Sequence, residues 1–320
     1  AKMVEAGCRY IVMEVSSQSY LMHRVDGLFF DYGIFLNISN DHIGPNEHAS
    51  FEEYLYYKKQ LLKNCRTALV NRDDPHFDAI VEGATAEILT FSLEQAADFT
   101  ADDIHYVREH DFVGVEFQTH GRYEHDLRVG IPGKFNVDNA LAAAGVCSFF
   151  DLPKEKVCHA LEHIQVDGRM EIVYKSAKCT VIVDYAHNAV SMESLLLTLR
   201  DYKPKRLLCG GNRARDRRYS MGEIGGKLAD LSIITADNSR FEKVEDILAD
   251  IKVGLAKTDG KYVEIPDRRE AIEYSLSHAE DGDIIAIIGK GHEDYQEIEG
   301  VRYHFLDREV VQETVKKLHM

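Results

Sequence analysis

The chain has 320 residues, which is enough for about two domains of ordinary size. Apolar residues make up 45% and charged residues 29%, a balance that excludes wholesale disorder, a collagen-like repeat and a coiled-coil rod. Lys and Arg number 38 against 54 Asp and Glu, so the net charge is −16, which argues against a nucleic-acid partner.

No stretch approaches the roughly 18 apolar residues of a membrane-spanning helix, and the first residues lack the layout of a secretory signal. The cysteines form no C-x-x-C pair and lie mostly in apolar stretches, so we expect free thiols rather than a zinc site or disulfides. These features predict a cytoplasmic protein with no membrane partner. The cysteines are Cys8, Cys65, Cys147, Cys158, Cys179 and Cys209.

Apolar runs and amphipathic stretches alternate through the first part of the chain, and a β-rich stretch from Ile104 to Gly130 indicates a small antiparallel insert. Two helices are expected after that insert. The predicted elements are strands at Tyr10–Val15, Ile34–Ile38 and Thr67–Asn71, and helices at Phe51–Asn64, Phe135–Phe150 and Pro153–Ile164.

From Glu171 onward strands and helices alternate regularly, which predicts an α/β fold with a parallel sheet covered on both faces. The break near Gln165–Gly168 predicts a domain boundary that separates residues 1–166 from residues 167–320. The predicted strands are Val181–Asp184, Arg206–Cys209, Leu231–Ala236, Tyr262–Ile265 and Asp283–Ile288, and the helices are Met192–Arg200, Met221–Ala229, Val244–Lys257, Arg268–Ala279 and Arg308–Leu318.

Polar clusters follow the predicted strands. Because parallel sheets place ligands outside the carboxyl ends of their strands, clusters at successive strand ends predict a ligand site there. The clusters begin at Glu14, Asn37, Asp184, Gly210, Asp237 and Gly289.

Three sets of residues in these clusters allow two interpretations each from the residues alone. Glu14 and His42 fit a divalent cation, normally Mg²⁺ in phosphate chemistry, or a simple hydrogen-bonded polar pair. Asp184 fits a ribose-binding carboxylate or a helix N-cap. The four arginines between 213 and 218 fit an acidic ligand, because guanidinium groups bind carboxylate or phosphate bidentately, or a solvated charged loop.

Seven motifs occur in an order that resembles the Mur ligases, ATP-dependent enzymes that form amide bonds in peptidoglycan precursor synthesis. The resemblance covers nearly the whole chain and is strongest to the members that add the third residue of the stem peptide. The motifs are EVSSQ at 14–18, NISNDH at 37–42, PGKFNVDNALAA at 132–143, DGRMEIV at 167–173, VDYAHN at 183–188, DNSRFE at 237–242 and GKGHEDYQ at 289–296.

The resemblance implies part of a central ATPase domain, a parallel sheet with a small antiparallel insert, followed by a Rossmann-like domain that binds the amino acid. It implies an acid–amino-acid ligase that uses ATP and Mg²⁺. Its substrates would be UDP-N-acetylmuramoyl-L-alanyl-D-glutamate and a diamino acid, which meso-diaminopimelate fits best, joined through an acyl phosphate. A monomer is expected.

The resemblance also implies roles for residues of the first predicted domain. Glu14 and His42 match Mg²⁺ ligands, and Ser16 and Arg24 match residues that hold the UDP-muramoyl substrate. Lys58 matches a lysine that is carbamylated in the family, where the carbamate ligates a second Mg²⁺. In isolation, Lys58 has the pattern of a surface helix lysine.

Asn139 matches a position near the adenine of ATP. Arg169, Asp184, Tyr185 and His187 match residues around its ribose and phosphates, and His187 joins Lys58 as a catalytic residue. The matches for the incoming amino acid are Arg213, Asn238, Arg240, Gly289 and Glu293. Arginines suit the far carboxylate of a diamino dicarboxylic acid, and Glu293 and the Gly289 carbonyl suit its far amine.

The family's P-loop, of the type GTxGKT, has no match in the sequence, since all four Gly-Lys pairs are followed by Phe, Leu, Tyr or Gly. We therefore expect an N-terminally truncated chain that lacks ligase activity by itself. A lysine-adding or other amino-acid-adding member of the family, and a non-catalytic binding module, are the alternatives.

Overall fold

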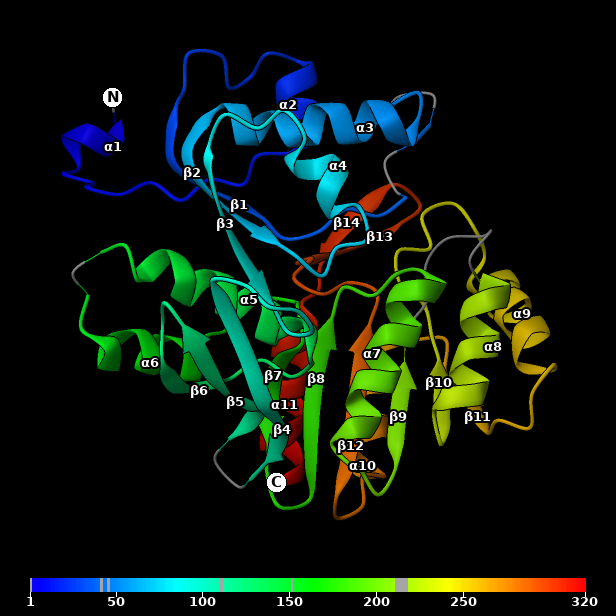
Figure 1. The fold of residues 1–320 in the computed structure, drawn as a ribbon. Coiled ribbons are helices and arrows are strands. Elements are labelled where there is room, and N and C mark those ends of the chain that lie inside the picture. The colour runs from blue at the N-terminus through cyan, green and yellow to red at the C-terminus, as the bar shows by residue number, and fades with distance from the viewer. Residues whose placement is uncertain (1, 41–42, 45–46, 110–111, 151, 211–217) are drawn as a thin grey trace. The chain divides into compact units, whose positions relative to one another are not determined.

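The structure is a computed structural model that describes residues 2–40, 43–44, 47–109, 112–150, 152–210 and 218–320 (Figure 1). The chain divides into two compact units. The first comprises residues 1–102, 118–125 and 138–153, and the second comprises residues 103–117, 126–137 and 154–320.

A six-stranded sheet holds the N-terminal strands in the order β1-β2-β3-β4-β5-β6, and β1 to β4 pair in parallel. Strands β4 to β6 occupy the predicted insert and contribute residues to both units. The bounds are β1 Phe30–Phe35, β2 Cys65–Asn71, β3 Glu87–Ser92, β4 Phe99–Arg108, β5 Val113–Gly121 and β6 His125–Val129.

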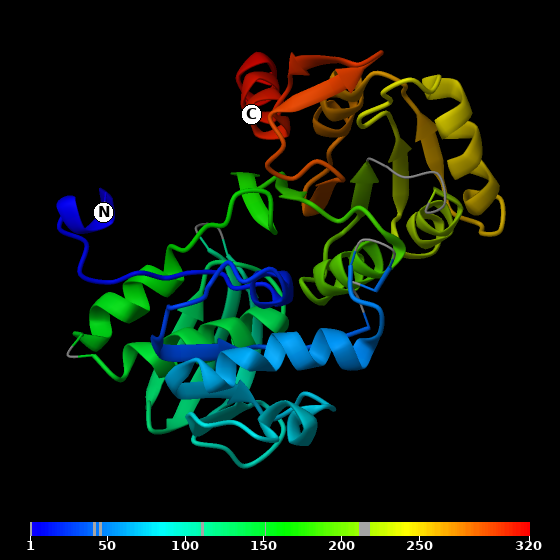
Figure 2. The same ribbon diagram turned by 90° about the horizontal axis from the view of Figure 1, so that it is seen from above.

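Alternate residues of β2 face opposite sides of this sheet, as the strand period requires. Ala68 and Val70 pack with Tyr54 of helix α3 (Phe51–Lys58), which runs along the strands of the first unit in Figure 2. Leu69 lies against Gly145 of helix α5 (Phe135–Cys147). The remaining helices of this part are α1 Lys2–Glu5, α2 Ser17–Leu21, the 3-10 turn η1 Lys59–Lys63 and α4 Phe77–Val81.

A second six-stranded sheet forms the second unit, in the order β11-β10-β9-β12-β8-β7. Its five pairings are parallel except that β7 runs antiparallel to β8. The strands are β7 Glu171–Lys175, β8 Cys179–Asp184, β9 Leu207–Gly210, β10 Leu231–Ile234, β11 Tyr262–Glu264 and β12 Asp283–Ile288, and a hairpin follows, β13 Tyr295–Ile298 and β14 Val301–His304.

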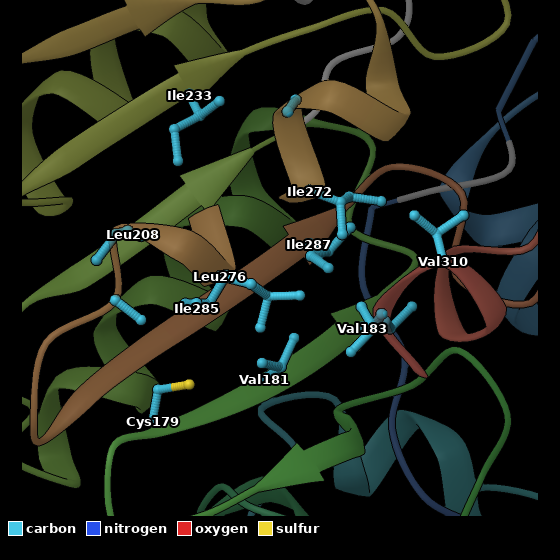
Figure 3. Close-up of a cluster of buried hydrophobic side chains, with 13 residues drawn as sticks. Cys179, Val181, Val183, Leu208, Ile233, Ile272, Leu276, Ile285, Ile287 and Val310 are labelled. Carbon is cyan, nitrogen blue, oxygen red and sulfur yellow. The ribbon is translucent and has the colours of Figure 1, made fainter. Parts of the chain in front are cut away.

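Helices cover both faces of this second sheet, so the predicted α/β fold is confirmed. One face packs Val181, Val183, Ile285 and Ile287 against α10 and α11 (Figure 3). On the other face Met192 of α7 lies beside Gly225 of α8, and α9 packs on Ile234. The helices on this sheet are α7 Ala189–Asp201, α8 Arg218–Leu228, α9 Val244–Leu255, α10 Arg268–Ser277 and α11 Asp307–Leu318. Helix α6, Lys154–Glu162, instead contacts the segment of β6, where the Gly130 N–H donates to the Leu161 carbonyl.

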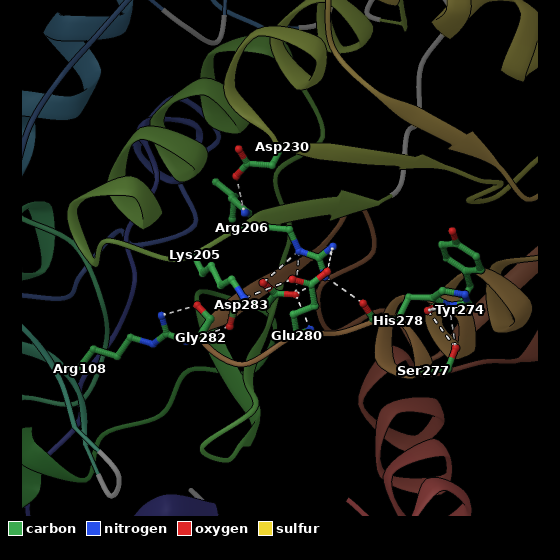
Figure 4. A network of polar contacts seen from close by, with 11 residues as sticks. Arg108, Lys205, Arg206, Asp230, Tyr274, Ser277, His278, Glu280, Gly282 and Asp283 are labelled. Carbon is green, nitrogen blue, oxygen red and sulfur yellow. Dashed lines mark hydrogen bonds and ion pairs between the residues drawn. The ribbon is translucent and has the colours of Figure 1, made fainter.

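A polar network holds the amino end of β12 (Figure 4). The Asp283 carboxylate is fully buried and accepts bonds from Arg206 Nε at 3.2 Å and Nη2 at 2.6 Å. Arg108 donates to the carbonyls of Gly282 and Asp283 at 3.0 and 2.8 Å. This end of the strand is therefore structural, because a buried carboxylate needs such partners.

The predicted strand at Tyr10–Val15 is wrong. The segment is irregular, and Tyr10, Ile11, Val12 and Met13 are all exposed. An apolar run becomes a buried strand only when neighbouring strands pair with it, and none of the described strands does so here. The predicted strand Ile34–Ile38 begins and ends earlier, as β1.

Candidate functional site

The carboxyl ends of β8, β10 and β12 bring predicted site residues of the second unit together. Asp184 is the last residue of β8, Asn238 follows β10, and Gly289 follows β12. Strands β8 and β12 are direct neighbours, with Asp184 opposite Ile288. The strand ends thus meet at one edge of the sheet, as the sequence predicts for a ligand site.

Asp184 organises the backbone around this edge. Its carboxylate accepts hydrogen bonds from the N–H groups of Met170 at 2.8 Å and Ala186 at 2.7 Å. Its carbonyl accepts a bond from the Gly289 N–H at 3.2 Å. Burial raises the pKa of the Asp184 carboxyl, against the opposing effect of these N–H donors. Asp184 therefore ties the turn after β8 to both neighbouring segments.

Tyr185 and His187 lie next to each other after β8. Their rings make an edge contact with centroids 4.8 Å apart, and His187 Nδ1 lies 2.9 Å from the Tyr185 carbonyl. The exposed Arg169 guanidinium lies over the Tyr185 ring at 5.0 Å. Cationic and aromatic groups at one sheet edge suit a ligand with anionic groups and a planar base.

Glu293 connects Tyr185, which follows β8, with Asn238, which follows β10. Its carboxylate accepts a hydrogen bond from the Tyr185 hydroxyl at 3.3 Å and from Asn238 Nδ2 at 3.0 Å. The side-chain Oδ1 of Asn238 accepts the Glu297 N–H at 2.9 Å. Only 12% of the Glu293 side chain is exposed, so its carboxylate is held in place at the rim of the site.

Arg240 occupies a constrained backbone position with φ of 54°, in the left-handed region that non-glycine residues rarely adopt. The Arg240 N–H donates to the Glu297 carbonyl at 2.9 Å, and the Arg240 carbonyl accepts the Glu299 N–H at 2.5 Å. These bonds fix the backbone while the side chain stays exposed. Strain held by surrounding structure is typical of functional positions.

The GKGHE segment approaches the rest of the site closely at two glycines. Gly289 has φ of 106°, and a Cβ there would lie 3.0 Å from an Asp237 carboxylate oxygen. Gly168 has φ of 66°, and a Cβ there would lie 2.1 Å from the His292 nitrogen. A side chain at either position would displace the segment that carries Glu293.

In the first unit, Lys58 points into the region between β1 and α3. Its ammonium donates to the Asn37 carbonyl at 2.7 Å and to the Tyr54 hydroxyl at 3.2 Å. Lys59 points elsewhere and donates to the Ala79 carbonyl at 3.0 Å. The two neighbouring lysines therefore have different surroundings, which sequence alone does not reveal.

The other predicted residues of the first unit have exposed side chains. Ser16 caps α2, where its hydroxyl accepts the Ser19 N–H at 3.2 Å. Arg24 Nη2 lies 3.4 Å from the Met22 sulfur. Glu14 and Asn139 are exposed, on an irregular segment and on α5 respectively.

His42 and Arg213 lie outside the described residues. Among the residues that are described, no three His, Cys, Asp or Glu side chains gather in a way that holds a metal ion. Glu14 and Lys58, as they stand, do not form a divalent-cation site, because an ammonium group is a hydrogen-bond donor and not a ligand.

Two buried side chains near the predicted residues were not anticipated. Lys290 lies inside GKGHE and is fully buried. His48 is also fully buried, and its Nε2 lies 2.8 Å from the Ser17 hydroxyl, next to Ser16. The signal for both was the motif itself, since each lies within or beside a predicted polar cluster.

Comparison with known families gives two matches along the chain. The Mur ligase middle domain matches residues 1–147, and the Mur ligase glutamate ligase domain matches residues 168–291. The chain belongs to the Mur ligase family. Both matched stretches of this Mur ligase chain contain residues that the sequence assigned to the site.

Two curated relatives carry the same name. A UDP-N-acetylmuramoyl-L-alanyl-D-glutamate–2,6-diaminopimelate ligase of Caldanaerobacter subterraneus subsp. tengcongensis is 39% identical over 317 residues, which is 97% of this chain and 64% of the relative. The ligase of the same name from Clostridium botulinum is 37% identical over 99% of this chain and 65% of the relative. The Mur ligase chain thus spans less than two thirds of the length of these relatives.

Solved structures agree with membership of the Mur ligase family. The structure of a UDP-N-acetylmuramoyl-L-alanyl-D-glutamate–2,6-diaminopimelate ligase superimposes with a TM-score of 0.74 and 31% identity, covering 99% of this chain and 66% of that one. A Mycobacterium tuberculosis folylpolyglutamate synthase, at TM-score 0.60 and 19% identity over 81% of this chain and 61% of that one, shares the fold. No described helix of the Mur ligase chain is long and apolar enough to span a membrane.

Proposed function

We propose that this chain belongs to an ATP-dependent ligase that adds meso-diaminopimelate to UDP-N-acetylmuramoyl-L-alanyl-D-glutamate in peptidoglycan precursor synthesis. The observation that carries the proposal is the Glu293 carboxylate, held by Tyr185 and Asn238 at one edge of the second sheet. A fixed carboxylate at the same sheet edge as the exposed Arg240 suits a ligand that presents both an amine and a carboxylate. The names of the relatives support the choice of ligand.

The amino acid is bound in this proposal by Asn238, Arg240, Gly289, Glu293 and Arg213. Arg240 takes the far carboxylate, since a guanidinium binds carboxylate bidentately. Glu293 and the Gly289 carbonyl accept hydrogen bonds from the far amine. L-Lysine has the far amine but no far carboxylate, so it leaves Arg240 without its ligand.

ATP is proposed to lie against Asn139, Arg169, Asp184, Tyr185 and His187. Asp184 is a carboxylate suited to ribose hydroxyls, and Arg169 and His187 are suited to phosphate oxygens. When bound, ATP supplies the phosphoryl group that activates the substrate carboxylate as an acyl phosphate. The role of the chain's own residues is to bind and orient the anionic partners, which is most of what phosphoryl-transfer sites do.

The muramoyl substrate is proposed to contact Ser16 and Arg24, and Mg²⁺ to be held by Glu14, His42 and a carbamylated Lys58. Carbamylation replaces the Lys58 ammonium by an anionic group whose oxygens suit Mg²⁺. The surroundings of Lys58 support the modification, because the Asn37 carbonyl and the Tyr54 hydroxyl already hold its side chain in one position.

The proposal extends to the organisation of the protein. A domain boundary at 166/167 falls between the two stretches that the family matches cover. We propose a monomer in the cytoplasm, where its small-molecule substrates would be found.

The proposal is tested by ligation and by binding. The whole protein, supplied with ATP, Mg²⁺, the UDP-muramoyl dipeptide and meso-diaminopimelate, is expected to yield the tripeptide product and phosphate, measured by mass spectrometry and phosphate release. Replacement of meso-diaminopimelate by L-lysine is expected to abolish most of the product. Equal product from both amino acids would contradict the proposed substrate.

A further inference from the structure

Lys290 is a charged side chain in the interior of the second unit. Its relative exposure is 0%, and it lies between Gly289 and Gly291 in the turn after β12. A buried ammonium group is costly unless carboxylates and hydrogen bonds compensate it. The contacts of Lys290 therefore show which groups compensate its buried charge, and which parts of the chain the ammonium holds together.

The Lys290 ammonium links both ends of the segment that carries Glu293. It donates a hydrogen bond to the Tyr295 carbonyl, at the start of β13, and lies 5.4 Å from the centre of the Tyr295 ring. Its distance to the Glu293 carboxylate is 3.9 Å. The Lys290 carbonyl accepts the Glu293 N–H at 2.9 Å. Backbone and side chain of Lys290 thus both hold residues 289–295.

The environment of the ammonium is rich in charge. Burial lowers the pKa of Lys290, while Asp237, Asp307 and Glu293 oppose that shift. Asp307 is itself paired with the fully buried Arg268, through bonds of 2.8 and 2.7 Å. The guanidinium of Arg268 also donates to the Ile288 carbonyl at 2.9 Å. Lys290 is therefore a member of a buried charge network directly beneath the turn.

The same segment reaches the residues that follow β10. Gln296 Nε2 donates to the Asp237 carbonyl at 2.9 Å, and the Glu297 N–H donates to Asn238 Oδ1 at 2.9 Å. Asn238 in turn donates to Glu293. Fixing residues 289–297 therefore also fixes Asn238, which donates to the Glu293 carboxylate.

We propose that Lys290 is a positioning residue that holds the Glu293 carboxylate, and through it Asn238, in the orientation that binds an ammonium group of the ligand. Lys290 does not contact the ligand. The identity of that ligand as meso-diaminopimelate rests on the proposed function, whereas the hold of Lys290 on residues 289–297 does not.

The first test needs no ligand. Amide hydrogen exchange is compared in the 320-residue chain, in Lys290→Met and in Lys316→Met, the matched change at an exposed lysine of α11. In Lys290→Met the amides of Glu293 and Glu297 are expected to exchange about tenfold faster or more, while those of β8 and β12 keep their protection. Unchanged exchange at both amides would overturn the proposal.

The second test separates positioning from general loosening. Calorimetry measures binding of meso-diaminopimelate and of 2-aminopimelate, which keeps both carboxylates but lacks the far amine. Lys290→Met is expected to weaken meso-diaminopimelate about tenfold and 2-aminopimelate little, because only the first uses Glu293. Equal weakening of both ligands would overturn the positioning role.

A double-mutant cycle guards against a folding defect. In the Glu293→Gln background, Lys290→Met is expected to cost less than about twofold in meso-diaminopimelate affinity, because the group it positions is already lost. Full additivity would overturn the proposal. If the unmodified chain binds neither ligand, the proposed function fails, and the exchange experiment alone decides the role of Lys290.

Discussion

Tyr185 donates a hydrogen bond to the Glu293 carboxylate at 3.3 Å, across 108 positions of sequence. The first residue follows β8 and the second follows β12, and these two strands pair directly. In the proposed function Tyr185 lies on the nucleotide side and Glu293 on the amino-acid side. The bond therefore places the two binding regions of the second unit in direct contact.

Tyr185→Phe removes a hydrogen-bond donor to Glu293 and keeps the ring that Arg169 covers. We expect meso-diaminopimelate to bind about three- to tenfold more weakly, the usual effect of losing a hydrogen bond to a charged group. Calorimetry on the 320-residue chain measures this. Tyr262→Phe, at a half-exposed tyrosine of β11, is the matched control and is expected to change nothing.

Lys58 and Lys59 are expected to differ in function. In the whole protein, Lys58→Ala should abolish ligation, with partial recovery on adding bicarbonate or a small carboxylate, whereas Lys59→Ala should be mild. The physical reason is direction, since adjacent helical side chains point about 100° apart and contact Asn37 and Ala79 respectively.

Carbamylation of Lys58 has a direct spectroscopic measurement. With isotope-labelled bicarbonate, the carbamate carbon signal should appear in the unmodified protein and in Lys59→Ala, and disappear in Lys58→Ala. A signal that persists in Lys58→Ala and disappears in Lys59→Ala would show that Lys59 is the modified residue, and would contradict the prediction.

Arg206→Met is expected to destabilise the second unit without affecting ligand binding. It leaves the buried Asp283 carboxylate without its main ion-pair partner, which costs about 3 kcal/mol in the free energy of unfolding. Arg269→Met breaks an exposed pair with Glu313 and should cost less than about 1 kcal/mol. Urea denaturation compares the two, and equal costs would contradict the structural role of the network.

The cysteines should differ in reactivity with pH. Burial raises the pKa of Cys65 and of Cys179 to about 11, because the thiolate is poorly solvated there. Cys8 is exposed. Alkylation at mildly alkaline pH, followed by peptide mass spectrometry, should modify Cys8 and spare the other two until the pH approaches their raised values. Early modification of Cys65 or Cys179 would contradict the folded cores around them.

The regular alternation of strands and helices in the second unit could be read from sequence, because continuous apolar strands and amphipathic helices have distinct periods. Strand β3 and the antiparallel β7 were not predicted. Strand β7 contains Lys175 and only three apolar residues, so its pairing with β8 is a tertiary effect that its own sequence does not encode. The error at Tyr10–Val15 has the converse cause, since an apolar run without a pairing strand stays irregular.

In the candidate site too, local sequence predicted some features, while others depend on tertiary contacts. The motifs located Asp184, Tyr185, Asn238 and Glu293, because polar residues at strand ends carry a positional signal. The bonds among them depend on strand order, which places β12 between β8 and β9. The left-handed backbone of Arg240 also could not be predicted, because it arises from pairing with Glu297 and Glu299, far along the chain.

The amino-acid preference tests the account most directly. Calorimetry on the 320-residue chain compares meso-diaminopimelate with L-lysine, before and after Arg240→Ala. We expect the chain to prefer meso-diaminopimelate by about a hundredfold or more, because L-lysine leaves the Arg240 guanidinium without a carboxylate. In Arg240→Ala the preference should largely disappear. Equal affinity for the two amino acids in the unmodified chain, or an unchanged preference in Arg240→Ala, would contradict the proposed substrate and the role of Arg240.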